Sequence, residues 1–124
     1  MRILHTSDWH LGIRHGAVSR GADHDLFLNW LEQQLSERAI DALVVAGDIF
    51  DAMQPSAEAL SRYYAFLGRV GRTGVRQVVI VGGNHDSASR LDAPSEVLAA
   101  LDVHVVGGIG GSTESWERCL VPLR

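Results

Sequence analysis

The chain has 124 residues, of which 46% are hydrophobic and 21% are charged, and its formal net charge is −4. This composition is typical of one globular domain, and no apolar run is long enough to span a membrane. The acidic balance argues weakly against a protein that holds nucleic acid by its own surface, because such proteins are usually basic. With one cysteine, Cys119, and no apolar signal-peptide core after Met1, the chain is expected to be cytoplasmic.

Four short apolar runs, taken in chain order, predict β-strands. The runs are continuous rather than alternating, which is typical of parallel strands that are covered on both faces. They comprise Ile3–Thr6, Ala42–Ala46, residues 78–81 and Val103–Val106.

Helical patterns lie between these runs. Apolar residues recur at helical spacing over residues 22–38 and 55–72, and Pro55 suits the start of the second helix. Residues 94–101 predict a shorter third helix. Strands that alternate with helices favour an α/β fold with a mainly parallel sheet.

The C-terminal end of the sequence is less regular. Residues 107–111, GGIGG, predict a flexible turn in preference to a phosphate-binding loop. Residues 118–123 predict one more strand, which Pro122 interrupts.

Polar side chains follow each of the first three predicted strands. The three segments read SDWHLG, GDIFD and GNHD, and each begins just past a strand. Because parallel strands bring their carboxyl ends to one edge of the sheet, where α/β proteins bind ligands, these side chains are expected to meet. In chain order they are Asp8, His10, Asp48, Asn84, His85 and Asp86.

Four of these residues are candidate metal ligands: Asp8, His10, Asp48 and Asn84. Carboxylate, imidazole and amide oxygen donors together suit Mn, Fe or Zn. The spacing of Asp8 and His10 would let an extended backbone present both to the same side, and the two oxygens of Asp48 could bridge two ions. Two ions about 3.5–4 Å apart can clamp a phosphodiester and activate water. Each segment alone could be a polar turn; all three in order favour the metal site.

The ordered motifs D-x-H, G-D and G-N-H-D resemble the calcineurin-like metallophosphoesterase superfamily. The segments MRILHTSDWHLG, DHDLFLNWL, DALVVAGDIFD and GGNHDS are more closely similar to its SbcD-type nuclease family, found in bacterial SbcCD complexes, with archaeal and eukaryotic counterparts in double-strand-break repair. The segment CLVPLR is similar to the next strand of that family. The resemblance spans nearly the whole chain and implies a layered αββα sandwich.

The resemblance also implies roles for the candidate residues. Asp8 and His10 would bind one metal ion, and Asp48 would bridge that ion to a second one held by Asn84. His85 would act near the leaving group, as a proton donor or as a transition-state stabiliser.

Further implications of the resemblance concern Asp86, the cofactor and the partners. Asp86 would orient the histidine beside it, and two divalent ions, expected to be Mn²⁺, would serve as cofactors. The implied activity is 3′→5′ exonuclease and endonuclease cleavage of DNA in repair, recombination and replication. The implied partner is an SbcC-type ATPase, with a homodimer of the nuclease subunit inside a heterotetramer.

The family completes its metal site with later histidines, one alone and a G-H-x-H pair. No histidine follows His104 in this sequence. Residues 1–124 are therefore expected to be the N-terminal part of a phosphoesterase domain, without its C-terminal half and DNA-contacting cap region. Two alternatives remain open: another phosphatase or small phosphodiesterase of the superfamily, and a catalytically incomplete domain that only pairs with a partner.

Five further residues carry predictions of their own. Trp9 lies between two candidate ligands and is expected to pack beneath their loop. Trp30 and Tyr64 lie on apolar helical stripes and are expected in the core. Asp51 is expected to brace its own loop rather than to bind metal, and His24 is expected to be structural.

Overall fold

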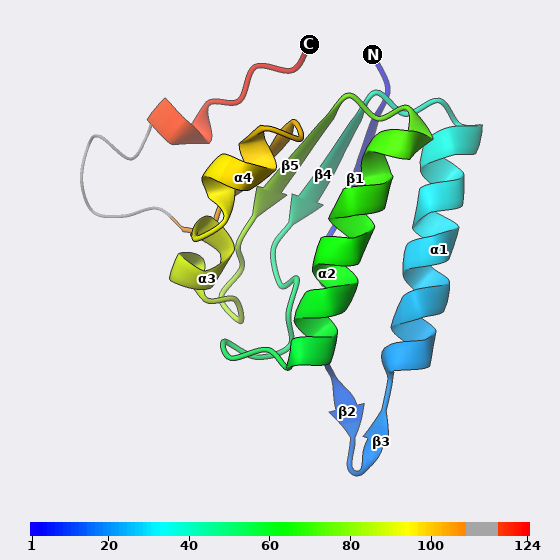
Figure 1. The fold of residues 1–124 in the computed structure, drawn as a ribbon, viewed down its shortest axis with the longest axis vertical. Coiled ribbons are helices and arrows are strands. Elements are labelled where there is room, and N and C mark those ends of the chain that lie inside the picture. The colour runs from blue at the N-terminus through cyan, green and yellow to red at the C-terminus, as the bar shows by residue number, and fades with distance from the viewer. Residues whose placement is uncertain (109–116) are drawn as a thin grey trace.

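A computed structural model describes residues 1–108 and 117–124. Its central element is a sheet of parallel strands in the order β1-β4-β5-β6 (Figure 1). The register places Thr6, Val45, Ile80 and Val105 side by side, so the carboxyl ends of all these strands lie at one edge. The predicted parallel sheet is confirmed, in strands β1 (Ile3–Thr6), β4 (Ala42–Ala46), β5 (Gln77–Val81) and β6 (Val103–Val106).

Two long helices connect the first three of these strands. They are α1 (Gly21–Glu37) and α2 (Ala57–Val70), and a 3₁₀ turn, Gly71–Thr73, extends α2. The Ser56 hydroxyl caps α2 by accepting a hydrogen bond from the backbone N–H of Ala59 at 3.1 Å. The helix therefore begins two residues after Pro55, which precedes the cap instead of opening the first turn.

Smaller elements differ more from the predictions. A two-stranded hairpin, β2 (Arg14–His15) and β3 (Val18–Ser19), precedes α1 where no strand was predicted. Of two short helices, α4 (Ser95–Ala99) confirms the helix predicted over residues 94–101, whereas α3 (Ala88–Asp92) was not predicted.

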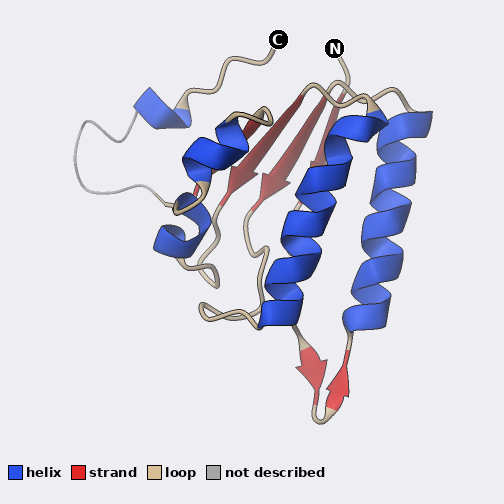
Figure 2. Cartoon of the chain, in the orientation of Figure 1, coloured by secondary structure: helices blue, strands red, loops and turns tan. Residues whose placement is uncertain are grey.

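All the helices from α1 to α4 lie on one face of the sheet (Figure 2). Strand residues that point to this face, such as Leu43 and Ile80, are fully buried, whereas Ile3 and Val81 on the opposite face are 52% and 41% exposed. On that opposite face Ala42, Gln77 and Val106 are nevertheless buried, so the expectation of strands covered on both faces holds only in part. The described residues contain no second sheet of an αββα sandwich. An apolar run shows which side chains avoid water, but not which residues cover them.

The core lies between the sheet and the helices. Helix α1 contributes apolar side chains from one stripe, α2 contributes a wider face, and α3 and α4 contribute one leucine each. In that order they are Leu28, Leu31, Leu35, Ala59, Tyr63, Phe66, Leu67, Val70, Leu91 and Leu98.

Trp30 and Tyr64, which were expected in the core, are 53% and 40% exposed. Trp30 lies on the outer side of α1 and stacks on Phe27 at a centroid distance of 6.2 Å. The apolar residues of α1 thus occupy more of the helix surface than the sheet can cover.

The C-terminal residues do not form the strand predicted over 118–123. Glu117–Cys119 form a 3₁₀ turn, and the residues after it have no regular structure. Gln77 holds this segment through its side chain, donating to the Pro122 carbonyl at 3.1 Å and accepting from the Arg124 backbone N–H at 2.6 Å. Residues 109–111 of the predicted glycine turn lie outside the described residues. Among the helices that are described, none has the length and apolarity needed to cross a membrane.

Candidate metal centre

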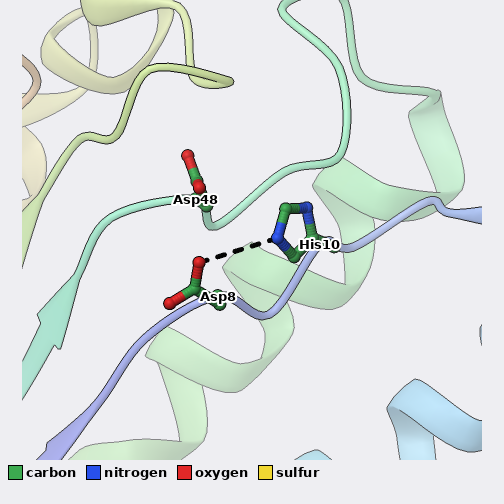
Figure 3. A group of neighbouring side chains, drawn as sticks. All are labelled: Asp8, His10 and Asp48. Carbon is green, nitrogen blue, oxygen red and sulfur yellow. Dashed lines mark ion pairs between the residues drawn. The ribbon is translucent and has the colours of Figure 1, made fainter.

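Asp8, His10 and Asp48 meet at the carboxyl edge of the sheet. Asp8 and His10 lie on the segment that leaves β1, and Asp48 lies on the segment that leaves the neighbouring β4 (Figure 3). Each residue offers one donor atom, and these atoms all lie within 4.8 Å of one another. Asp8 Oδ1 and His10 Nε2 face each other at 3.7 Å.

The backbone of all three residues is in the left-handed region, with φ of 57° at Asp8, 48° at His10 and 49° at Asp48. Residues with side chains adopt this conformation at a cost of about 1–3 kcal/mol, and it persists only where the surroundings enforce it. The two aspartates and the histidine are therefore aimed by tight turns, not by the extended backbone that the D-x-H spacing predicted.

Hydrogen bonds between the two segments enforce these turns. Beyond the strand ends, the backbone N–H groups of Asp8, His10 and Leu11 donate to the carbonyls of Gly47, Asp48 and Ile49 at 3.0, 3.0 and 2.9 Å. The β1–β4 pairing thus continues into the loops and fixes the candidate ligands relative to one another.

Trp9 anchors the first segment from below. Its side chain is buried, meets Phe27 and Phe66 edge to face, and donates from Nε1 to Thr6 Oγ1 at 3.0 Å. The prediction that Trp9 packs beneath the loop is confirmed.

Local hydrogen bonds favour the charged form of Asp8. The Ser7 hydroxyl donates to Asp8 Oδ2 at 2.6 Å, and this bond is the main cause that holds the pKa of Asp8 below its ordinary value, with a smaller contribution from His10. Oδ1 remains directed toward His10, so an ionised, solvent-accessible oxygen is available to a cation.

Asp51 stands behind His10. Its Oδ1 lies 3.5 Å from His10 Nδ1, and its backbone N–H donates to the Leu11 carbonyl at 3.1 Å. A carboxylate behind a ligating imidazole fixes the ring and leaves the other nitrogen for a metal. Sequence reasoning missed this contact, although the position of Asp51 on the loop beside D-x-H was a usable indication.

The loop after β5 brings the third predicted cluster to the same edge. The His85 backbone N–H donates to Asp48 Oδ1 at 3.1 Å, and the rings of His85 and His10 lie 5.6 Å apart. Asn84 is exposed in this loop, and its side chain makes no hydrogen bond within the described part of the chain. The ligand roles of these residues remain predictions.

Asp86 does not contact His85 in the way the resemblance implied. Its buried carboxylate accepts three backbone N–H groups, from Gly83 at 2.8 Å, Phe50 at 2.9 Å and Ile49 at 3.1 Å. Among the described residues no hydrogen bond joins it to the His85 side chain. A buried carboxylate without a cationic partner needs several donors, and the neighbouring loop backbone supplies them.

The donor set of Asp8, His10 and Asp48 fits a divalent cation. Two carboxylates and one imidazole on a strained, hydrogen-bonded backbone suit a hard or borderline metal, whereas a soft metal would need thiolates. Metal-assisted hydrolysis is a chemistry that such a donor set can support.

The comparisons with known proteins agree with this chemistry. A family model described as calcineurin-like phosphoesterase matches residues 1–117. The chain is 47% identical over 127 residues to the protein of Rhodobacter capsulatus that is named as the D component of the nuclease SbcCD, covering 100% of this chain and 31% of the relative. Identity to the proteins of the same name is 42% in Escherichia coli K12, covering 95% of this chain and 29% of the relative, and 39% in Bacillus subtilis, covering 86% and 27%. The chain thus spans less than a third of the length of these curated relatives.

Proposed function

The chain belongs to the calcineurin-like phosphoesterase family, and from this premise we propose that it is the N-terminal part of a metal-dependent DNA nuclease of the SbcD type. The reaction would be hydrolysis of DNA phosphodiesters by exonuclease and endonuclease cleavage, in repair, recombination and replication. The observation that carries the proposal is the convergence of Asp8, His10 and Asp48 on one point. It gains support from the high identity to proteins that are named as components of a nuclease.

Four residues would hold the metal. Asp8 and His10 would bind one ion, Asp48 would reach both ions through its two carboxylate oxygens, and Asn84 would bind the second. We propose Mn²⁺, because mixed carboxylate, imidazole and amide donors suit it. When bound, such a pair of ions neutralises phosphate charge and activates water.

His85 would act on the leaving group. Its backbone is fixed by the hydrogen bond to Asp48 Oδ1, while its imidazole is exposed at the rim of the site. An imidazole at that place can give a proton to the departing sugar oxygen. Asp51 would keep His10 oriented so that Nε2 faces the metal.

The names of the relatives place them in the SbcCD complex, so we propose an SbcC-type ATPase as the partner. We also propose a homodimer of the nuclease subunit within a heterotetramer, acting on DNA in the cytoplasm. The net charge of −4 favours an arrangement in which bound cations and the partner supply much of the attraction for DNA.

An assay of linear duplex DNA cleavage by the full-length protein tests the proposal. We expect degradation that requires Mn²⁺, stops with a chelator and is lost in Asp48→Ala. Asp41→Ala is a matched control, because Asp41 lies before β4 at the opposite end of the strand, where it pairs with Arg76. Hydrolysis of a phosphopeptide or a small chromogenic diester without cleavage of DNA would instead support another phosphoesterase.

A further inference from the structure

Asp86 carries the one buried carboxylate among the described residues, with 6% of its surface exposed. No arginine or histidine side chain contacts it in that part of the chain. A carboxylate in such a place remains satisfied only if neutral donors surround it. The groups that donate hydrogen bonds to the Asp86 carboxylate therefore indicate its role.

Two of the three donors belong to a different loop. They are the backbone N–H groups of Ile49 and Phe50, the residues directly after Asp48. The third donor, Gly83, lies in the same loop as Asp86, three residues earlier. The carboxylate thus joins the loop after β5 to the loop after β4 at the point where Asp48 emerges.

The loop after β4 is held on both sides of Asp48. On one side the backbone N–H of Gly47 donates to the Val81 carbonyl at 2.8 Å, and on the other side Ile49 donates to Asp86 at 3.1 Å. Between these two bonds Asp48 has φ of 49°. Strained backbone of this kind needs such restraint from its neighbours.

The donors have no alternative partner in water. Ile49 and Phe50 are buried, and the Phe50 ring packs edge to face against Tyr63 at 5.2 Å. Without the Asp86 carboxylate the N–H groups of Ile49 and Phe50 would be left unpaired in the interior, which is costly enough to make the loop move.

We propose that Asp86 is a positioning residue that holds Asp48 in its metal-binding conformation by accepting the N–H groups of Ile49 and Phe50. This inference rests on the proposed metal site. It gives Asp86 a role in metal affinity, in place of the orientation of His85 that the resemblance implied.

Titration of the full-length protein with Mn²⁺, which measures its Mn²⁺ affinity, tests the inference. Asp86→Asn is expected to bind Mn²⁺ about 10–100-fold more weakly than the wild type, as is typical when a group behind a metal ligand is removed. Asp86→Glu keeps the charge but displaces the oxygens, so its affinity should lie between those of the wild type and Asp86→Asn. Asp92→Asn is the matched control, since Asp92 also accepts a backbone N–H, from Gly107 at 2.8 Å, away from the candidate ligands.

Thermal unfolding is measured on the same variants, and Mn²⁺ binding is measured at a temperature at which each variant is folded. A merely structural role would lower the melting temperature of Asp86→Asn and leave its Mn²⁺ affinity unchanged. Wild-type affinity in either folded Asp86 variant would overturn the inference. That outcome differs from failure of the nuclease proposal, in which the wild type binds Mn²⁺ but does not cleave DNA.

Discussion

His85 differs from the candidate metal ligands because its backbone, and not its ring, contacts Asp48. A ring that is free of the metal can serve as a proton donor. We therefore expect His85→Gln to retain Mn²⁺ binding and to lose about 10²–10⁴-fold in the rate of DNA cleavage. Metal titration and single-turnover kinetics on the same preparation check this, and loss of metal in the variant would show that His85 is a ligand.

His24 is the residue from which we expect a dependence of stability on pH. Burial, followed by the charges of Arg62 and Arg20, lowers its pKa, while Asp23 and Asp25 oppose the shift. Its Nδ1 is buried without a hydrogen-bond partner in the described part of the chain. The folded protein therefore resists a proton that the unfolded chain accepts near pH 6.5, an ordinary value for histidine.

The stabilisation from neutral His24 is accordingly complete above about pH 6.5 and is lost as the pH falls toward the lowered pKa of the folded state. We expect the melting temperature of the wild type to fall more between about pH 7.5 and pH 5 than that of His24→Gln. An equal fall in melting temperature over this pH range in the two proteins would show that His24 does not cause the pH dependence of stability.

Among the structural elements, the loops after β4 and β5 pack too closely for a side chain at Gly83. A Cβ atom there would lie 2.3 Å from Asp48 Oδ1 and 2.4 Å from the Asp48 backbone nitrogen. We expect Gly83→Ala to displace Asp48 and to weaken Mn²⁺ binding by at least about 10-fold, the low end of the effect of disturbing a ligand's support.

Gly68→Ala provides the comparison for Gly83→Ala. Gly68 lies within α2, and a Cβ there would meet nothing within 4 Å. Alanine should stabilise the helix by about 0.5–1 kcal/mol and leave Mn²⁺ binding unchanged. If the two alanine variants bound Mn²⁺ equally, the close packing of these loops would have no role in the site.

The elements that the sequence predicted are those with a long apolar pattern. Three of the four predicted strands have the predicted bounds, and β5 begins one residue earlier, at Gln77. The β2–β3 hairpin was missed because strands of two residues carry no period. The separation of α3 from α4 lies at Ala93 and Pro94, where the proline marked a helix start but not the end of another helix.

Across the whole molecule, the strand order predicted where the candidate residues meet, but not how they are oriented. Three neighbouring parallel strands, β1, β4 and β5, deliver their loops to one edge, as the motifs indicated. The left-handed turns at Asp8 and Asp48 could not be predicted, because the hydrogen bonds that impose them come from residues distant in sequence. The same holds for the contacts of Asp51 and Asp86.

The helices of the described molecule lie on one face of the sheet (Figure 1). The candidate metal centre lies at the carboxyl edge of that sheet. At this edge Asp8 is exposed and His10 and Asp48 are half-buried, while the buried Trp9 packs beneath their loop.

Calorimetric titration of the protein with Mn²⁺, in the wild type and in Asp48→Ala, tests the central claim most directly. The account predicts saturable binding in the wild type and at least about a tenfold loss of affinity in Asp48→Ala, with binding unchanged in Asp41→Ala. Equal Mn²⁺ affinity in the wild type and Asp48→Ala, or no binding by the folded wild type, would contradict the assignment of a metal centre to the loops that follow β1 and β4.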